Sequence, residues 1–587
     1  MSRVSCGLIL WAVLLAPLAA AQNPNPPASV TGQAPGTSAQ NPAAAALLER
    51  QRAAMEAFLR GRSSWGTAGA DAQRSWWVHT DPKISREGVQ KPDFKFLWKI
   101  KLPGAASDAN SLSPAVLLNR YIGYRGFRNL AFVANSGVAV YGIDVDLGRI
   151  EWTVNDPQAS AGFCAAGTLN GVARPLNAAF SSPAPAPGFG RGGPAQSAVG
   201  APYAGAVTLA QAGRFGFSLP PPGAMTGRST PTSVPPSAAS PSGAPLPGRG
   251  DANAPGVPGS GGALARPPRT PVVIYVLTAD GMLHTMYVSN GQEPKSAIPF
   301  LPRNSAAQGF IVVNDIAYAV DISCSGGAST LVSLDIQSGA KHTWNAPSEI
   351  AGQLGPAFGP DGTVYVSTVH GDLFALDPKA LTVRDTLSLG EPIASSPVIF
   401  QYGRRVLGAV ATRRGRLVLF DTKSLGGDDH RTPLFKTLPN AGQSFSSITL
   451  ASWMDNGGRR WIVLPARKPG KGAIAAWLVQ EQGGTLRLNL GWRSSEIPSP
   501  SPAMIINGVV FAASNADPGS AGKRRRSPSV IYALDGLTGK ELWDSGKSIT
   551  SSAYHGSLSG GGSQIYLGTD DGNLYAFGAW IEREISP

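Results

Sequence analysis

A glycine-centred hairpin pattern recurs along most of this chain and constrains the fold more than any other feature. Each occurrence is a short alternating strand, a tight turn that ends in glycine, and a second alternating strand. The turn glycines are Gly137, Gly281, Gly371, Gly415 and Gly572. Gly371 and Gly415 are 44 residues apart, and the longer step from Gly281 to Gly371 leaves room for one further unit. A period in the forties with paired strands is typical of β-propeller blades.

Two further signals flank the hairpins. An Asp-led turn with a glycine is followed by tryptophan in three segments, 144–152, 335–344 and 535–543. The turn makes a tight corner, and the repeated tryptophan indicates a repeated packing site. A Ser-Pro step precedes other hairpins, as at 395–400 and 500–506. Proline suits the first residue of a strand, where no ladder donor is needed. Each unit therefore contains four strands.

The units number eight, and together they predict an all-β fold. They are centred near residues 140, 280, 325, 370, 415, 472, 525 and 570. The last unit stops before its fourth strand, whereas an unmatched strand with Trp98 precedes the first. We expect this N-terminal strand to complete the C-terminal blade and close the ring. The prediction is an eight-bladed β-propeller of four-stranded antiparallel blades. Seven blades are the alternative count, because the unit at 460–492 is irregular.

These motifs resemble the pyrroloquinoline-quinone (PQQ) type repeat. "SPAMIINGVVFAASN" followed by "VIYALDGLTGKELW" is similar to a nearly complete unit of that repeat, interrupted by an insertion. The resemblance covers roughly residues 94–578 apart from one long insertion. It implies the propeller fold and leaves two functional classes open. Quinoprotein alcohol dehydrogenases of this family hold PQQ and calcium in the central funnel, whereas the BamB-like outer-membrane assembly factor is a scaffold without a cofactor.

The N-terminal region predicts export. Residues 1–21 combine Arg3, an apolar run and a small-residue cleavage site before Gln22, which is the pattern of a secretory signal peptide. We therefore expect a periplasmic or secreted protein. Cys6 lies at the start of the apolar run rather than at its end, so no lipid anchor is expected. No later segment is long and apolar enough for a transmembrane helix.

Four regions follow the signal peptide. Residues 22–62 read as a disordered linker and a short amphipathic helix. Residues 63–93 are similar to the lead-in segment of PQQ-like propellers and are expected to cross the ring's surface, with Trp65, Trp76 and Trp77 partly buried. The propeller spans 94–580, and the Pro/Gly/Ala/Ser-rich tract 165–270 is expected to be a disordered insertion within it.

Candidate catalytic residues are sparse. No adjacent cysteine pair and no C-x-x-C-H motif is present, and the six histidines do not form a zinc-binding helix pattern. The family's PQQ and calcium ligands cannot be placed residue by residue, so catalytic and cofactor-binding residues stay unassigned and no metal site is predicted. His555 is a weak candidate for a ligand contact in the channel, with packing as the alternative. Cys164 and Cys324 are candidates for a disulfide between neighbouring blades.

Charge suggests a partner surface. The chain has a formal net charge of +13, concentrated in basic runs at 404–405, 413–416, 459–460 and 523–527. Such runs are usually solvated turns. Alternatively, they attract an acidic protein or an anionic envelope surface, and Lys523, Arg524, Arg525 and Arg526 are the predicted docking site. Nucleic acid is not an expected partner of an exported protein.

Two functions therefore remain open. The favoured prediction is a non-catalytic protein–protein interaction scaffold of the cell envelope, acting as a monomer. The alternative is a PQQ- and calcium-dependent dehydrogenase that oxidises alcohols or sugars in the periplasm. The fold alone does not decide between the two, because function depends on a site rather than on an architecture.

Overall fold

A computed structural model describes the propeller and its lead-in segment. The described residues are 65–103, 112–123, 126–135, 139–155, 177–181, 272–278, 280–302, 305–323, 329–439, 445, 447–468, 471–515 and 527–579. All of them belong to one compact unit, Ala57–Pro587. Within them the regular structure is almost entirely β, with two short 3-10 turns, η1 (Gly88–Gln90) and η4 (Gly427–Asp429). None of the described segments forms a helix that could cross a membrane.

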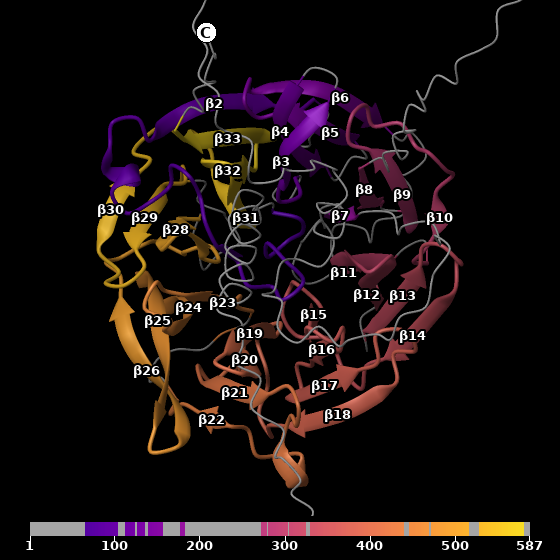
Figure 1. Ribbon diagram of the computed structural model, residues 1–587, viewed down its shortest axis with the longest axis vertical. Helices are drawn as coiled ribbons and strands as arrows, with labels where there is room; N and C mark the ends of the chain where they lie inside the picture. The colour runs from indigo at the N-terminus through magenta and orange to yellow at the C-terminus, as the bar shows by residue number, and fades with distance from the viewer. Residues whose placement is uncertain are drawn as a thin grey trace, which may run out of the picture. The chain divides into compact units, whose positions relative to one another are not determined.

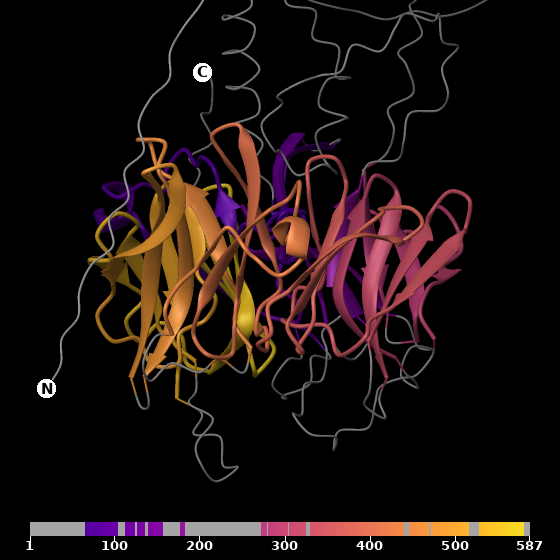
Figure 2. The same cartoon turned by 90° about the horizontal axis from the view of Figure 1, so that it is seen from below.

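Eight sheets, each built around four consecutive antiparallel strands, stand around a common centre (Figures 1 and 2). The first four blades, each from its innermost strand outward, have the following strands. Blade 1 contains β3 (Val116–Gly123), β4 (Gly126–Ala134), β5 (Ala139–Asp144) and β6 (Arg149–Asn155). Blade 2 contains β7 (Asn177–Ser181), β8 (Val273–Leu277), β9 (Met282–Tyr287) and β10 (Ile298–Pro299). Blade 3 contains β11 (Ser305–Val313), β12 (Ile316–Ser323), β13 (Thr330–Asp335) and β14 (Lys341–Asn345). Blade 4 contains β15 (Ala357–Phe358), β16 (Val364–Ser367), β17 (Asp372–Leu376) and β18 (Val383–Ser388).

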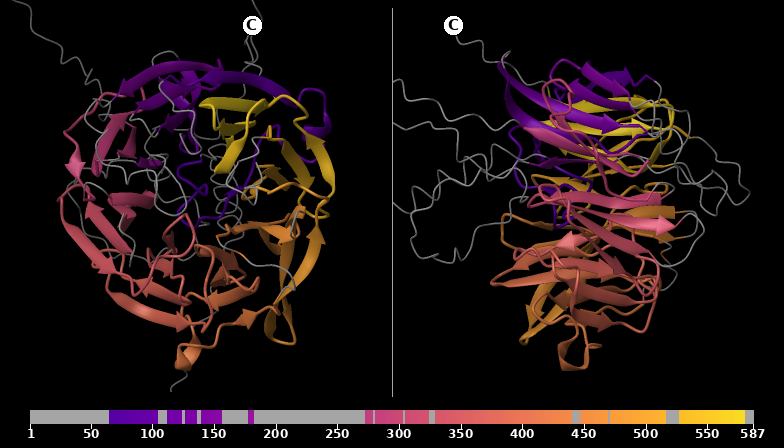
Figure 3. Two further views of the ribbon diagram at one scale, coloured as in Figure 1. Left: turned by 180° about the vertical axis from the view of Figure 1, so that it is seen from behind. Right: turned by 90° about the vertical axis from the view of Figure 1, so that its right-hand side faces the viewer.

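The other four blades continue the ring (Figure 3). Blade 5 contains β19 (Val398–Tyr402), β20 (Arg405–Ala411), β21 (Leu417–Asp421) and β22 (Phe435–Lys436). Blade 6 contains β23 (Ala451–Met454), β24 (Arg460–Lys468), β25 (Lys471–Gln482) and β26 (Thr485–Arg493). Blade 7 contains β27 (Met504–Ile506), β28 (Val509–Ala513), β29 (Ile531–Asp535) and β30 (Glu541–Asp544), with β1 (Trp77–Val78) added on its inner side. Blade 8 contains β31 (Ala553–Gly561), β32 (Gln564–Thr569), β33 (Asn573–Gly578) and β2 (Lys95–Lys101).

The blade count and the ring closure confirm the sequence prediction. Blade 8 takes its outermost strand from the N-terminal side, because β2 pairs antiparallel with β33, with Trp98 opposite Ala576. The segment around 460–492, which is irregular as sequence, forms the regular sheet β23–β26, so the seven-blade alternative is wrong. Pairing of β2 with β33 supplies the outermost strand of the last blade, so the outer edge of β33 is covered rather than open to another chain.

Apolar packing lies between the blades. The second and third strands of a blade are covered on both faces by its neighbours, so they are mostly apolar and buried; every residue of β5, β28 and β32 is buried. Outermost strands face solvent on one side and alternate, as in β26, where buried and exposed positions interchange. The burial pattern of a strand therefore follows from its position in the blade.

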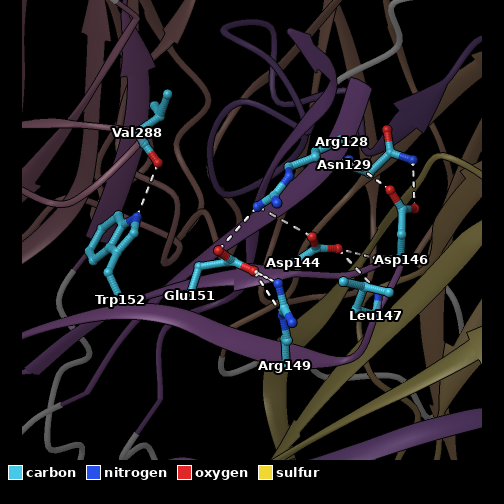
Figure 4. A network of polar contacts seen from close by, with 9 residues as sticks. All are labelled: Arg128, Asn129, Asp144, Asp146, Leu147, Arg149, Glu151, Trp152 and Val288. Carbon is cyan, nitrogen blue, oxygen red and sulfur yellow. Dashed lines mark hydrogen bonds and ion pairs between the residues drawn. The ribbon is translucent and has the colours of Figure 1, made fainter. Parts of the chain in front are cut away.

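Three tryptophans join consecutive blades in the same way. In each case the indole N–H of an outermost strand donates to a main-chain carbonyl of the next blade (Figure 4 shows Trp152). The pairs are Trp98 to Val145 at 3.0 Å, Trp152 to Val288 at 3.1 Å and Trp492 to Gly536 at 2.8 Å. The repeated packing site expected from the sequence is thus an interblade contact. Trp152, Trp344 and Trp543 remain partly exposed.

The Asp-led turn of blade 1 shows why that motif recurs (Figure 4). The Asp144 carboxylate accepts hydrogen bonds from the backbone N–H groups of Asp146 and Leu147 and so closes the corner. Arg128 lies between Asp144, at 3.6 Å, and Glu151, at 3.1 Å. The pKa of Asp144 is raised because burial disfavours its charged form. The network holds strands β4, β5 and β6 together and has a structural role.

One predicted boundary is wrong. The tract 165–270 was expected to be a disordered insertion throughout, yet Asn177–Ser181 form β7 and pair antiparallel with β8 as the innermost strand of blade 2. Only Phe180 in "NAAFS" favours a strand, so the backbone partners supplied by β8, which the local sequence does not reveal, decide its conformation. The remainder of that tract, the signal peptide, and the linker and helix predicted within 22–62 lie outside the described residues.

Candidate functional site at the centre of the ring

The later part of the lead-in segment runs over blade 7, where Arg86 pairs with Asp535 and Phe94 packs against Trp543. The first part, residues 65–78, lies in the middle of the ring rather than on its surface, which differs from the sequence expectation (Figures 1 and 3). Its backbone carbonyls accept hydrogen bonds from the innermost strands of five blades. In each pair the backbone N–H of the first residue donates to the carbonyl oxygen of the second, with N–O distances of 2.8 to 3.1 Å: Leu117 to Trp65, Phe358 to Ala72, Ile399 to Gln73, Ser452 to Ser75 and Ile505 to Trp76. Trp65 and Trp76 are completely buried rather than partly so, because inner strands surround them on several sides.

Arg74 is the polar centre of this segment. It has no exposed surface, and its guanidinium donates to three main-chain carbonyls: from Nε to Pro356 at 3.0 Å, from Nη1 to Ala68 at 2.6 Å and from Nη2 to Gly309 at 3.0 Å. Burial lowers its pKa to about 9, while the nearby Asp71 carboxylate acts in the opposite direction. Arg74 therefore links the lead-in segment to blades 3 and 4 through fixed hydrogen bonds.

The backbone around Arg74 is strained. Ala70, Arg74 and Trp76 all have positive φ, at 75°, 60° and 55°. Each such residue costs on the order of 1 kcal/mol, because its β-carbon crowds the backbone in the left-handed region. The surrounding hydrogen bonds impose this conformation. Asp71 contributes locally by accepting hydrogen bonds from the backbone N–H and hydroxyl of Ser75.

A second polar feature lies where the lead-in segment passes blades 5 to 7. Trp77 and His79 stack with ring centroids 3.6 Å apart. The guanidinium of Arg460 lies close to two aromatic rings, 5.4 Å from the centroid of Trp77 and 5.6 Å from that of Phe400. Arg460 Nε donates to the carbonyl oxygen of Gln401 at 3.1 Å. We call these five residues the Arg460 cluster.

Electrostatics in the Arg460 cluster is dominated by uncompensated positive charge. Arg460 keeps only 6% of its surface exposed, although the sequence places it in a basic turn of the solvated type. Burial lowers its pKa to about 10, and no carboxylate opposes this shift.

The remaining site residues predicted from sequence are not assembled by the described structure. His555 lies in β31, so its backbone belongs to an innermost strand as expected, and its side chain is outside the described residues. Cys164, Cys324 and the predicted docking run at 523–526 also lie outside the described residues. Each of them stays a prediction.

The two basic pairs at 404–405 and 459–460 do come together. They lie in the turns that follow the innermost strands of neighbouring blades, and the Arg460–Gln401 hydrogen bond joins those turns. Arg405 pairs with Asp421 at 2.7 Å, and Arg459 pairs with Asp455 at 2.7 Å. Sequence alone identified the charges but not their proximity. Arg74 and the Arg460 cluster were missed as site residues; the only sequence signal was an arginine within a tryptophan-rich lead-in.

The centre of the ring does not fit a calcium ion. Ca²⁺ takes about six to eight oxygen ligands, several of them from carboxylates. In the described part of the chain, no three His, Cys, Asp or Glu side chains converge as a possible metal site. The carboxylates that approach the centre, Asp71 and Asp81, are held by donors of the protein itself, Ser75 and Ser563. Arg74 and Arg460 add positive charge, which opposes a cation.

Comparisons with known proteins establish the fold. The chain has 10% sequence identity to a quinohemoprotein alcohol dehydrogenase from Pseudomonas putida HK5, with a TM-score of 0.50, covering 89% of this chain and 82% of that one. The quinohemoprotein alcohol dehydrogenase from Comamonas testosteroni gives 12% identity and a TM-score of 0.49, with the same coverages. BamB from Moraxella catarrhalis gives 16% identity and a TM-score of 0.33, covering 52% and 81%. No family model and no curated protein sequence matches. The chain has the PQQ-like repeat β-propeller fold.

Proposed function

We propose that this chain is a non-catalytic protein–protein interaction scaffold of the cell envelope, exported by its N-terminal segment. The observation that carries the proposal is the occupation of the ring's centre by residues 65–84 of the chain itself. Backbone carbonyls of that segment pair with innermost strands, and Arg74 is committed to main-chain oxygens. The residues that face the centre are thus used for internal support rather than for holding a quinone and a calcium ion.

A rigid ring with a filled centre suits a binding platform. Its stability comes from interblade packing and ring closure, so the loops at the two faces are free to differ without affecting the core. Aromatic and arginine side chains at one mouth of the ring, among them Trp77 and Arg460, are of the types that anchor protein interfaces. The alternative is a PQQ- and calcium-dependent dehydrogenase, which the repeat resemblance implies and which the shared fold of a solved quinohemoprotein alcohol dehydrogenase supports.

A cofactor titration separates the two. The full chain is mixed with PQQ and Ca²⁺ and followed by calorimetry and quinone absorbance; alcohols and sugars are then offered with an electron-accepting dye. We expect neither stoichiometric binding nor dye reduction. Tight binding with substrate-dependent dye reduction would overturn the scaffold proposal. In parallel, the full chain is used to capture partners from an envelope extract, with a variant in which residues 523–526 are replaced by serine as the comparison.

A further inference from the structure

Arg460 is a buried cation without an anion. Within the described residues its only hydrogen bond is from Nε to Gln401, and it forms no ion pair. Its two Nη nitrogens make no hydrogen bond to the described residues, and 6% of the surface of Arg460 stays exposed. A guanidinium presents its N–H groups in a plane that matches both oxygens of a carboxylate. The free edge at this mouth is therefore suited to a bidentate anion.

The cluster is built so that this edge cannot turn away. Trp77 and Phe400 both pack near the guanidinium, and the Gln401 carbonyl accepts a hydrogen bond from Nε. Holding a charge in this way costs free energy, because the group has been partly removed from water without a compensating charge. An anion bound at the Nη edge would recover that cost. Because the guanidinium is already held in place, less side-chain conformational entropy is lost when an anion binds.

The surroundings match an acidic protein segment. Met454, directly opposite Arg460 in the β23–β24 ladder, is 43% exposed, an apolar side chain beside the charge. The neighbouring β19–β20 turn adds the exposed Arg404. His79 is an exposed ring stacked on Trp77. An apolar, aromatic and arginine-rich surface with an excess of positive charge is complementary to an acidic side chain that is flanked by apolar residues.

We infer that the Arg460 cluster is a carboxylate-binding site, and that its ligand is an aspartate or glutamate side chain of an acidic segment in a protein partner. This inference rests on the proposed scaffold function, for which it names the docking site and the partner chemistry. The partner's carboxylate pairs with the Nη edge of Arg460, while neighbouring apolar atoms contact Met454 and the exposed ring of His79.

Binding of a fluorescent peptide tests the site. A labelled peptide of alternating Glu and Leu is titrated into the full chain and followed by anisotropy, with the Gln–Leu peptide as its uncharged counterpart. We expect only the acidic peptide to bind. Arg460→Gln is expected to weaken binding at least about tenfold, since it removes a charged partner. Arg459→Gln, which removes an adjacent arginine already paired with Asp455, is expected to change binding by less than about threefold. Equal losses in both variants would mean unspecific charge attraction and would overturn the site.

A second variant tests the site even if Arg460→Gln fails to fold, because it keeps Arg460 and places a carboxylate beside it. Met454→Glu places a carboxylate opposite Arg460, with Met454→Gln as its matched control. We expect Met454→Glu to raise the unfolding temperature relative to Met454→Gln and to abolish peptide binding. If Met454→Glu binds the peptide as well as its control does, the proposal is wrong.

Two further measurements distinguish a protein partner from a small molecule and from a membrane surface. In the first measurement, free glutarate is added as a competitor of the labelled peptide. If glutarate displaces the peptide at a concentration equal to that of the peptide, the site binds small molecules and the partner assignment is overturned. Vesicles containing an anionic phospholipid that bind the chain when the peptide does not would overturn it in favour of a membrane surface. The dye-reduction assay is independent of these arms. Turnover with PQQ would overturn the scaffold function, whereas loss of Arg460-dependent peptide binding would overturn only this site.

Discussion

The indole ring of Trp98 lies over Gly148 so closely that a β-carbon at position 148 would stand 2.6 Å from Cγ of that ring. Trp98 belongs to β2 and Gly148 to the Asp-led turn of blade 1, so the contact joins the last blade to the first. The same arrangement recurs where Trp152 lies over Gly291 and Trp492 over Gly539. In these turns glycine satisfies two demands at once, a positive φ and space for the neighbouring tryptophan.

Comparing alanine substitutions at Gly148 and Gly339 separates those two demands. Gly148→Ala is expected to destabilise the fold by about 2–4 kcal/mol, from a positive φ plus overlap with Trp98. Gly339→Ala is the matched control, since Gly339 has a φ of 74° in the equivalent turn of blade 3 but no atom within 4 Å of an added β-carbon. It should cost only about 1 kcal/mol. Guanidinium unfolding curves measure both, and equal costs would disprove a role for the ring contact.

Trp98 itself is expected to be critical for ring closure. Trp98→Ala should lower the free energy of unfolding by about 3–5 kcal/mol, because it opens a cavity between blades 8 and 1 and leaves the Val145 carbonyl without its indole donor. Trp98→Phe keeps most of the ring and should cost less than half as much. Trp344→Phe, at a partly exposed position, serves as the comparison. A loss for Trp98→Ala no larger than that for Trp344→Phe would contradict the interblade role.

Arg74 is expected to hold the lead-in segment in the channel. Arg74→Gln removes a buried cation and leaves carbonyls of Pro356 and Gly309 without donors, which should cost at least about 3 kcal/mol. Arg74→Lys should not restore stability, because an ammonium group cannot reach three separate carbonyls in the geometry of a guanidinium. Near-ultraviolet circular dichroism of the buried Trp65 and Trp76 reports the segment, and Arg404→Gln provides an exposed control. Wild-type stability for Arg74→Lys would contradict this role.

Acid should weaken blade 8 through Asp571. Burial alone would raise the pKa of this carboxyl, but hydrogen bonds from Ser551, Thr569 and Asn573 outweigh it and lower the pKa below 3.8. A depressed folded-state pKa adds stability above the unfolded value of about 3.8, and that stability is lost as pH falls through the folded pKa.

The matching variant is Asp571→Asn. It should be less stable than the wild type at pH 7, and the difference should shrink as pH falls below 3.8 and through the lowered folded-state pKa. Urea midpoints measured across this range test the effect, with Asp428→Asn at an exposed position as the control. A constant difference at every pH would show that hydrogen-bond geometry alone, and not ionisation, accounts for the effect of the substitution.

Local chemistry accounts for what could be predicted. Turn glycines such as Gly281 and Gly415 require positive φ and therefore show in the sequence, as do the alternating strands beside them. Repetition of those short signals was enough to predict four strands per unit, eight units and closure by the strand that contains Trp98, all of which the structure confirms. The partners of each strand are its chain neighbours, so little long-range information was needed.

The centre of the ring was decided by tertiary structure. Residues 65–84 have no periodic pattern, and most of their partners, such as Phe358 for Ala72, are separated from them by hundreds of residues. The burial of Arg460 likewise depends on Trp77 from the lead-in and Phe400 from the neighbouring blade. Sequence alone determined the repeat, because each blade is specified by local turns and alternation. Only the closed ring decided which polar groups face its centre, because that depends on the approach of segments far apart in the chain.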